Sequence, residues 1–137
     1  MPLLAPYITK VARVHGEKHP HLLRVQEIFD ELRRELLDHT EDEDANVFPF
    51  ILKFLENPTP ELKEKIEPHV IELEQEHENA GKLLFEIRNL TNEFTLPADA
   101  CGTYKLVYAR LEQLEKDTFE HVYLENHNLF DRVRAAL

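Results

Sequence analysis

The sequence predicts an all-α protein, an antiparallel up-down four-helix bundle with a shortened first helix, in one domain that covers residues 1–137. Three observations lead to this fold class. The chain contains only 3 Gly among 137 residues, which favours helices over a turn-rich β fold. Prolines divide the chain into a few long segments. Within these segments the apolar residues recur at alternating spacings of three and four residues, which is typical of helices packed side by side.

The first part of the chain contains two predicted helices and a short helical stretch. The first helix is expected from about Pro2 to Val14, and Gly16 follows its end, where glycine is common. The second helix begins near Pro20, which suits a first helical turn. It continues to about Phe48, because Pro49 then disrupts it. The short stretch covers residues 50–56.

The rest of the chain contains two long helices. A start signal surrounds Pro60, and Pro68 is expected to kink the chain or to restart it as the main third helix, which extends to about Phe94. The fourth helix is expected from about Asp99 to Phe130. In an up-down-up-down order, the end of the second helix, the start of the third and the end of the fourth lie on one side of the bundle.

Composition limits the function classes. A formal net charge of −11 argues against nucleic-acid binding, since phosphates select Lys and Arg. No apolar run approaches the length of a membrane span, and the N-terminus does not resemble a signal peptide. The single cysteine, Cys101, excludes an internal disulfide framework and fits a reducing compartment. We therefore expect a cytoplasmic protein.

Five ionisable residues occupy positions where the helical stripes require apolar side chains. Buried ionisable groups are costly unless they have a compensating interaction. The second helix carries two of them, the third helix one and the fourth helix two: His39, Glu43, His77, His121 and Glu125.

The five positions share one level of the predicted bundle. His39 and His121 each lie nine residues before the expected ends of their helices, and His77 lies nine residues after Pro68. At a rise of 1.5 Å per residue, all three imidazoles are about 13 Å from the same side of the bundle. Each glutamate of the set follows a histidine by four residues, one turn further along the same face. Three imidazoles and two carboxylates are therefore expected to converge on one layer.

Such a layer indicates a metal site, because bundle-core sites assembled from facing helices are how di-iron carboxylate proteins are built. Two carboxylates can bridge two metals, while imidazoles occupy the outer positions. A mixed nitrogen and oxygen donor set without thiolate suits iron or manganese better than a structural zinc.

A blander interpretation is a metal-free helical interaction domain whose polar layer is hydrogen-bonded. A lone core histidine is usually such a residue, but five coincidences in one layer favour a metal. Other candidates are expected outside the site. His19 and His21 are expected to be exposed at the first turn, His69 and His127 to lie on the surface, and Glu74 to belong to a solvated face.

Four segments of the chain resemble one known family, the iron–sulfur cluster repair di-iron proteins, also called the repair-of-iron-centres family, which carry a hemerythrin-like domain. The resemblance covers essentially the whole chain. The segments are Val-Ala-Arg-Val-His-Gly-Glu-Lys-His-Pro (11–20), Glu-His-Glu-Asn-Ala-Gly (76–81), Leu-Pro-Ala-Asp-Ala-Cys (96–101) and His-Val-Tyr-Leu-Glu-Asn-His-Asn-Leu-Phe (121–130).

The resemblance implies a cytoplasmic stress protein that repairs iron–sulfur clusters damaged by nitric oxide or oxidants. Its cofactor would be an oxo- and carboxylate-bridged di-iron centre that donates iron or reacts with NO or O₂, and its partners would be damaged iron–sulfur proteins. The family's bridging carboxylates match Glu43 and Glu125, and its terminal histidines match His39, His77 and His121.

The chain departs from the family pattern in two ways. The resemblance implies a small N-terminal domain with a cysteine pair, of which we expect no counterpart in these 137 residues. The family's remaining histidine ligand lies on the first helix, upstream of Met1. A first helix would need roughly 20 residues before its turn to reach the level of His39. We therefore expect one open quadrant and a weakened metal position, and we hypothesise that a second copy of the chain closes the gap as a homodimer.

Two functions from different classes use the same ligands. One is redox-active cluster repair, and the other is a hemerythrin-like module that reversibly holds O₂ or NO, or senses iron, without repair activity. The sequence shows no nucleophile–base pair such as Ser/His/Asp and no Gly-rich phosphate loop. Any redox reaction with NO or O₂ would therefore take place at the di-iron centre rather than at a conventional catalytic site.

Overall fold

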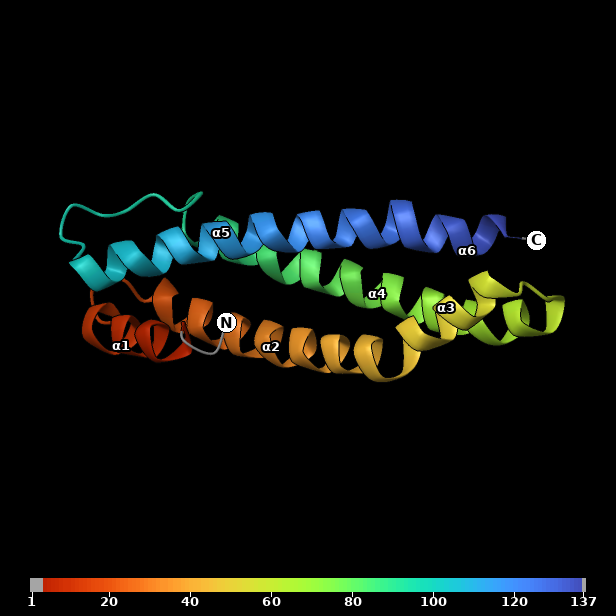
Figure 1. Ribbon diagram of the computed structural model, residues 1–137. Helices are drawn as coiled ribbons and strands as arrows, with labels where there is room; N and C mark the ends of the chain where they lie inside the picture. The colour runs from red at the N-terminus through yellow and green to blue at the C-terminus, as the bar shows by residue number, and fades with distance from the viewer. Residues whose placement is uncertain (1–3, 137) are drawn as a thin grey trace. The chain divides into compact units, whose positions relative to one another are not determined.

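The computed structural model describes residues 4–136, apart from the side chains of Asp42 and Asp44, and every regular element in that range is a helix. The all-α prediction is confirmed. In chain order (Figure 1), the elements are α1 (Ala5–His15), α2 (His21–Asp42), the π-helix η1 (Glu43–Val47), α3 (Phe48–Glu56), α4 (Pro60–Leu90), α5 (Gly102–Leu124), the π-helix η2 (Glu125–Phe130) and α6 (Asp131–Ala135).

The chain divides into two compact units. Unit 1 comprises residues 1–34 and 81–118, and unit 2 comprises residues 35–80 and 119–137. Helices α2, α4 and α5 each contribute residues to both units. All five predicted ligands fall in unit 2.

Unit 1 is built from four helical segments, namely α1, the first part of α2, the last part of α4 and most of α5. Polar contacts join neighbouring segments, as where Gln26 of α2 donates a hydrogen bond of 3.1 Å to the hydroxyl of Thr9 in α1. Each segment buries one apolar face. These faces form a core of Ile8, Val11, Leu22, Val25, Phe29, Leu84, Ile87, Tyr104, Val107 and Leu111.

Unit 2 has its own apolar core beside the site. This core joins η1, α3, the first part of α4, η2 and α6. Its members are Val47, Ile51, Phe54, Ile66, Val70, Leu73, Phe130 and Val133. Because each of them is at most 2% exposed, the core fixes η1, α4 and η2, which carry Glu43, His77 and Glu125.

Two helix boundaries predicted at prolines are not found. Pro68 lies inside one continuous helix, α4, and does not restart it. The carbonyl that loses its hydrogen bond belongs to Glu64, and both residues are exposed, so water can satisfy it. Pro49 does not end a helical run, since it lies in the first turn of α3, where its missing N–H costs little. The predicted start at Pro60 is correct, and the hydroxyl of Thr59 accepts a hydrogen bond from the Leu62 N–H at 3.2 Å.

Two predicted helix ends are also wrong. Helix α4 ends at Leu90 rather than near Phe94, because Asn92, Glu93 and Phe94 have φ values of 51°, 58° and 60°. This left-handed turn is closed by a 2.8 Å hydrogen bond from the Glu93 N–H to the carbonyl of Arg88. At the C-terminal end, the helical run does not stop at Phe130 but continues through α6.

Two histidines at the first turn are half-buried, not exposed as predicted. His19 Nε2 lies 3.0 Å from a carboxylate oxygen of Asp99, and His21 Nε2 lies 3.0 Å from the hydroxyl of Tyr108. Burial and the neighbouring His19 lower the pKa of His21. His69 and His127 are exposed, as predicted.

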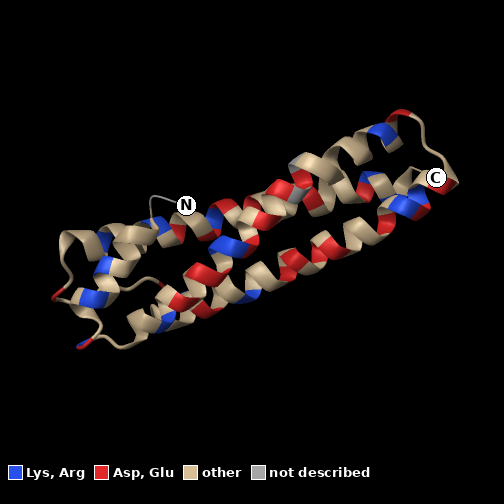
Figure 2. Ribbon diagram, turned by 90° about the horizontal axis from the view of Figure 1, so that it is seen from below, with Lys and Arg blue, Asp and Glu red and all other residues tan. Residues whose placement is uncertain are grey.

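The surface is predominantly acidic. Acidic residues are spread along the helices (Figure 2), in keeping with 27 Asp and Glu against 16 Lys and Arg. Among the described residues, no helix combines the length and the apolar character that crossing a bilayer requires.

Candidate metal centre

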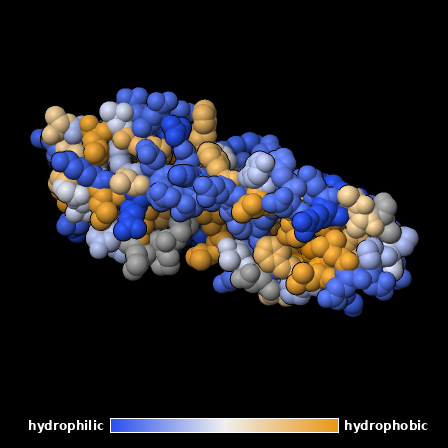
Figure 3. Space-filling view, turned by 45° about the horizontal axis from the view of Figure 1, so that its top comes forward, coloured by the Kyte–Doolittle hydropathy of each residue, from blue (hydrophilic) through white to orange (hydrophobic). Residues whose placement is uncertain are grey.

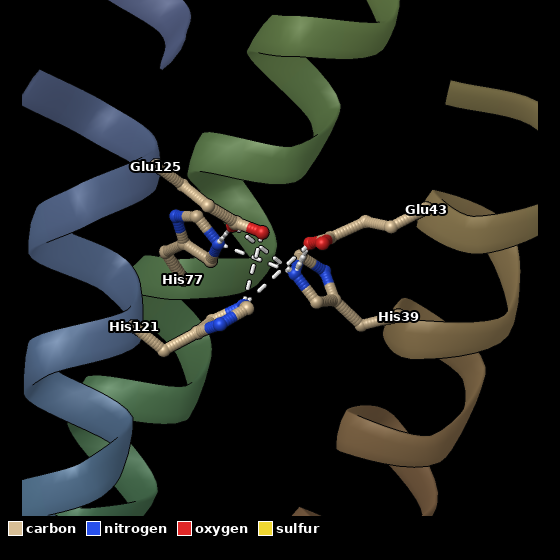
Figure 4. Close-up of side chains that lie close together, drawn as sticks. All are labelled: His39, Glu43, His77, His121 and Glu125. Atoms are coloured by element: carbon tan, nitrogen blue, oxygen red, sulfur yellow. Dashed lines mark hydrogen bonds and ion pairs between the residues drawn. The ribbon is translucent and has the colours of Figure 1, made fainter. Parts of the chain in front are cut away.

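The five predicted side chains come together in unit 2. One ligand atom from each of them lies within 4.8 Å of all the others. Figure 4 shows the five side chains pointing toward one another, with His39 and Glu43 on one helical run and His121 and Glu125 on another. His39 comes from α2, His77 from α4 and His121 from α5, while Glu43 and Glu125 are the first residues of η1 and η2.

Four of the five side chains are buried. The residues His39, Glu43, His77 and Glu125 are between 2% and 7% exposed. The side chain of His121 is different, with 49% of its surface exposed. The cluster is therefore enclosed on most sides and reaches solvent at His121.

The imidazole Nε2 atoms face the two carboxylates. His77 Nε2 lies 2.5 Å and His39 Nε2 3.5 Å from Glu125 Oε2, and His121 Nε2 lies 2.9 Å from Glu125 Oε1. Glu43 Oε1 contacts His39 Nε2 and lies 3.9 Å from His121 Nε2. The Nε2 atoms of His39 and His77 are 3.3 Å apart.

Two of the imidazoles are hydrogen-bonded on their outer side. His39 Nδ1 lies 2.5 Å from Glu76 Oε2, and His77 Nδ1 lies 3.0 Å from the amide oxygen of Asn126. Because a carboxylate and an amide oxygen only accept, each Nδ1–H donates. A neutral imidazole that donates from Nδ1 keeps the lone pair of Nε2 for the centre of the cluster. The ring of Phe130 also stacks on His77, with ring centroids 5.8 Å apart and planes at 18°.

Sequence reasoning missed Glu76 and Asn126. Each of them directly neighbours a predicted ligand in the chain, and so neither lies on the helical stripe that identified the five. Both residues lie in segments that resemble the iron–sulfur cluster repair family, residues 76–81 and 121–130. No spacing rule marks them, because a partner on the outer side of an imidazole can come from any neighbouring helix face.

Three carboxylate oxygens in the cluster are buried without a hydrogen-bond donor: Glu43 Oε1, Glu125 Oε1 and Glu125 Oε2. Imidazole nitrogens lie within ion-pair distance of these oxygens, but none directs an N–H at them with hydrogen-bond geometry. Buried oxygens left in this way are costly. Oxygens and Nε2 lone pairs that share one small volume fit a bound cation, with three nitrogen and two oxygen donors.

Without a cation, protons compensate the buried charges. Burial and the neighbouring Glu125 raise the pKa of Glu43 to about 7, against the opposing effect of His121. Contacts with Glu125 and then Glu43 raise the pKa of His121 to about 10. Burial alone would lower the pKa of His77, but Glu125 outweighs it and raises that pKa. Burial alone would raise the pKa of Glu125. Contacts with His121 and His77 outweigh burial and lower that pKa well below its usual range.

Each glutamate of the cluster begins a π-helical segment. A π-turn places one more residue in the turn than an α-helix does, and such turns are frequent at functional sites. The predicted layer assumes that helical runs stop at Phe48 and Phe130, but both runs continue, into α3 and into α6. The histidines and glutamates still meet, because the register of the apolar stripes, and not the position of the ends, sets which side chains face inward.

The chain is similar to known proteins over nearly its whole length. A family model described as the hemerythrin HHE cation-binding domain matches residues 2–133. The iron-sulfur cluster repair protein ScdA of Staphylococcus epidermidis is 42% identical over 130 residues, which are 95% of this chain and 57% of that protein. ScdA of Staphylococcus haemolyticus is 40% identical over 94% of this chain and 57% of its own length.

A second group of relatives carries a different name. The iron-sulfur cluster repair protein YtfE of Escherichia coli is 34% identical over 136 residues, which are 99% of this chain and 59% of that protein. The chain thus spans less than two thirds of the length of these relatives.

Proposed function

Because the chain belongs to the hemerythrin family of HHE cation-binding domains, we propose that its buried cluster of histidines and glutamates binds iron as a di-iron centre. Two carboxylates and an oxo group would bridge the metals, with imidazoles at the terminal positions. The proposed ligands are His39, Glu43, His77, His121 and Glu125. Residues 1–137 would act as a single hemerythrin-like domain, since the family model covers residues 2–133.

The observation that carries this proposal is the set of buried carboxylate oxygens that lack donors. These oxygens and the inward-facing Nε2 atoms occupy a volume in which all ligand atoms lie within 4.8 Å of one another. The donor set contains no thiolate, which favours iron or manganese over structural zinc. Iron bound here would supply redox chemistry and a binding position for NO or O₂.

We propose that this iron serves the repair of iron–sulfur clusters damaged by nitric oxide or oxidants. The names of the relatives, iron-sulfur cluster repair proteins at 34–42% identity, support this function. In that role iron is a cargo as well as a cofactor, and damaged iron–sulfur proteins are the partners. The free and exposed Cys101 suits a reducing compartment, so we propose the cytoplasm as the setting.

The test is a transfer experiment. The iron-loaded chain is mixed with an iron–sulfur enzyme whose cluster has been damaged by nitric oxide, and enzyme activity and the iron left on the chain are both measured. Repair predicts that activity returns while iron leaves the chain. His77→Ala should abolish both effects, whereas Glu72→Gln, an exposed position on the same helix, should leave both unchanged.

A second candidate is a hemerythrin-like module that holds O₂ or NO, or senses iron, without repair. The half-exposed His121 favours it, because a small ligand can reach the cluster from solvent on that side. The transfer experiment separates the two functions. A binding module takes up NO or O₂ reversibly and keeps its iron, and the damaged enzyme stays inactive.

We also propose that a second copy of the chain covers the exposed side of the cluster. Leu37, two residues before His39, is 42% exposed, and Leu124, directly before Glu125, is 55% exposed. These leucines offer apolar surface that a second copy would remove from water. Figure 3 shows apolar side chains at the surface among the polar ones.

A further inference from the structure

Glu76 makes the shortest hydrogen bond to the outer side of a proposed ligand. Its Oε2 lies 2.5 Å from Nδ1 of His39, a short contact for an N–H···O hydrogen bond, and hydrogen bonds to an ionised acceptor are the shorter and stronger ones. The His39 side chain is 5% exposed, whereas that of Glu76 is 38% exposed. A partly solvated carboxylate on α4 thus holds a buried imidazole on α2.

This contact determines which nitrogen of His39 carries the proton. An ionised carboxylate accepts hydrogen bonds and cannot donate them, so Nδ1 must carry a proton, and in the neutral ring it is the only protonated nitrogen. Nε2 of the neutral ring then has a free lone pair, which faces Glu43 and Glu125. A hydrogen bond to a carboxylate also raises the basicity of the metal-facing nitrogen.

His77 provides an internal comparison. Its Nδ1 donates to the neutral amide oxygen of Asn126 at 3.0 Å, which is a longer bond to an uncharged acceptor. The two buried imidazoles therefore differ in the charge of the group that accepts from Nδ1. A carboxylate withdraws the Nδ1 proton more strongly than an amide does, so His39 is the stronger donor of the two.

We propose that Glu76 is a positioning residue that fixes His39 as the Nδ1–H tautomer and makes it the stronger imidazole donor of the site. The proposal rests on the proposed metal site and deepens it, because it states which buried ligand holds the metal most firmly. The competing explanation is that Glu76 is a surface carboxylate that rests on the ring without consequence. In that case its removal changes neither the tautomer of His39 nor metal binding.

The experiment compares two substitutions at Glu76 with a matched control. Glu76→Leu removes the acceptor, whereas Glu76→Gln keeps an oxygen that can accept from Nδ1 but removes the charge. Glu72→Gln, one turn earlier on α4 and exposed, controls for the loss of a negative charge from the same helix. Circular dichroism of the metal-free proteins checks that all four chains fold.

Two measurements are made on each protein. Nitrogen-15 NMR of the metal-free chain, followed as a function of pH, reports the tautomer of His39 once that ring is neutral. Competition with a chelator under anaerobic conditions reports the affinity for ferrous iron. The wild type and Glu76→Gln should show the Nδ1–H tautomer, and Glu76→Leu should shift toward Nε2–H. Iron affinity should fall roughly 10–100-fold in Glu76→Leu, fall less in Glu76→Gln, and stay unchanged in Glu72→Gln.

The outcomes separate this inference from the proposed function. A Glu76→Leu variant that keeps the Nδ1–H tautomer, or that binds ferrous iron as tightly as the wild type, overturns the positioning role. If the wild type itself binds no iron, the proposed function fails. The tautomer of His39 in the metal-free proteins then still decides whether Glu76 orients the ring.

Discussion

The two glutamates of the cluster have opposite environments although both are buried. Glu125 lies within 3.5 Å of the Nε2 atoms of three imidazoles, whereas Glu43 faces Glu125 as well as histidines. Burial and Glu125 raise the pKa of Glu43 to about 7, and the imidazoles lower the pKa of Glu125. The metal-free site thus favours one carboxylate and one carboxylic acid, and a bound cation would allow both to ionise.

We expect Glu43→Gln to stabilise the metal-free protein and to weaken iron binding. The folded-state pKa of Glu43 is raised from 4.5 to about 7, so its ionisation destabilises the fold progressively as pH rises between these values. The variant should be more stable than the wild type at pH 8, by up to about 3 kcal/mol, and similar at pH 4. Urea unfolding at both pH values measures this. A variant less stable than the wild type at pH 8 contradicts the expectation.

His121 gives the opposite pH dependence. Its pKa is raised from 6.5 to about 10 by Glu125 and Glu43. The protonated imidazole therefore stabilises the metal-free fold fully below pH 6.5, and this contribution is lost as pH rises through about 10. We expect His121→Gln to be less stable than the wild type at pH 6 and nearly equal to it above pH 10. Unfolding by urea across this range tests it, and a constant difference would show that the charge of His121 does not matter.

At the scale of helices, sequence patterns predict which faces are buried better than where helices end. The inward-facing positions of His39, His77 and His121 follow from the apolar spacing on their three helices, because burial repeats with the helical period. The π-turns at Glu43 and Glu125 leave no such signal, since one extra residue in a turn hardly changes the pattern. Pro68 misleads for a similar reason, as its effect depends on whether water reaches the carbonyl of Glu64.

The left-handed turn after α4 permits a test at one position. Glu93 is exposed and has a φ of 58°, a region in which glycine is not strained. We expect Glu93→Gly to raise the stability by roughly 0.5–1 kcal/mol, after the greater freedom of glycine in the unfolded chain is counted. Thermal unfolding measures it. Glu72→Gly, in the middle of α4, is the matched control and should instead lose about 1 kcal/mol.

At the scale of the whole chain, a bound metal should stabilise the fold, because the ligands lie on segments far apart in the sequence. At a free iron concentration 100 times the dissociation constant, the gain is about 2.7 kcal/mol. A domain of this size would then melt on the order of 10 °C higher. Calorimetry with and without ferrous iron measures the shift, and His77→Ala should abolish it. A shift that persists in His77→Ala would place the metal elsewhere.

Hydrogen exchange can locate the same effect along the chain. All five proposed ligands belong to unit 2, and so iron should slow amide exchange mainly within residues 35–80 and 119–137. Residues 81–118 contribute no proposed ligand and provide the reference within the same sample. Equal slowing in both units would mean that the metal acts on global unfolding and not on local opening of the site.

Self-association is the remaining expectation for the whole molecule. If a second copy covers the exposed side of the cluster, sedimentation velocity should show a dimer fraction that rises with protein concentration, and the dimer should hold more iron per chain than the monomer. Leu124→Glu places a charge on that side and should weaken association about tenfold or more, as loss of an anchoring side chain does. Leu52→Glu, which is at a 62% exposed position on α3, should not. A folded monomer with full iron content at every concentration rules out the dimer.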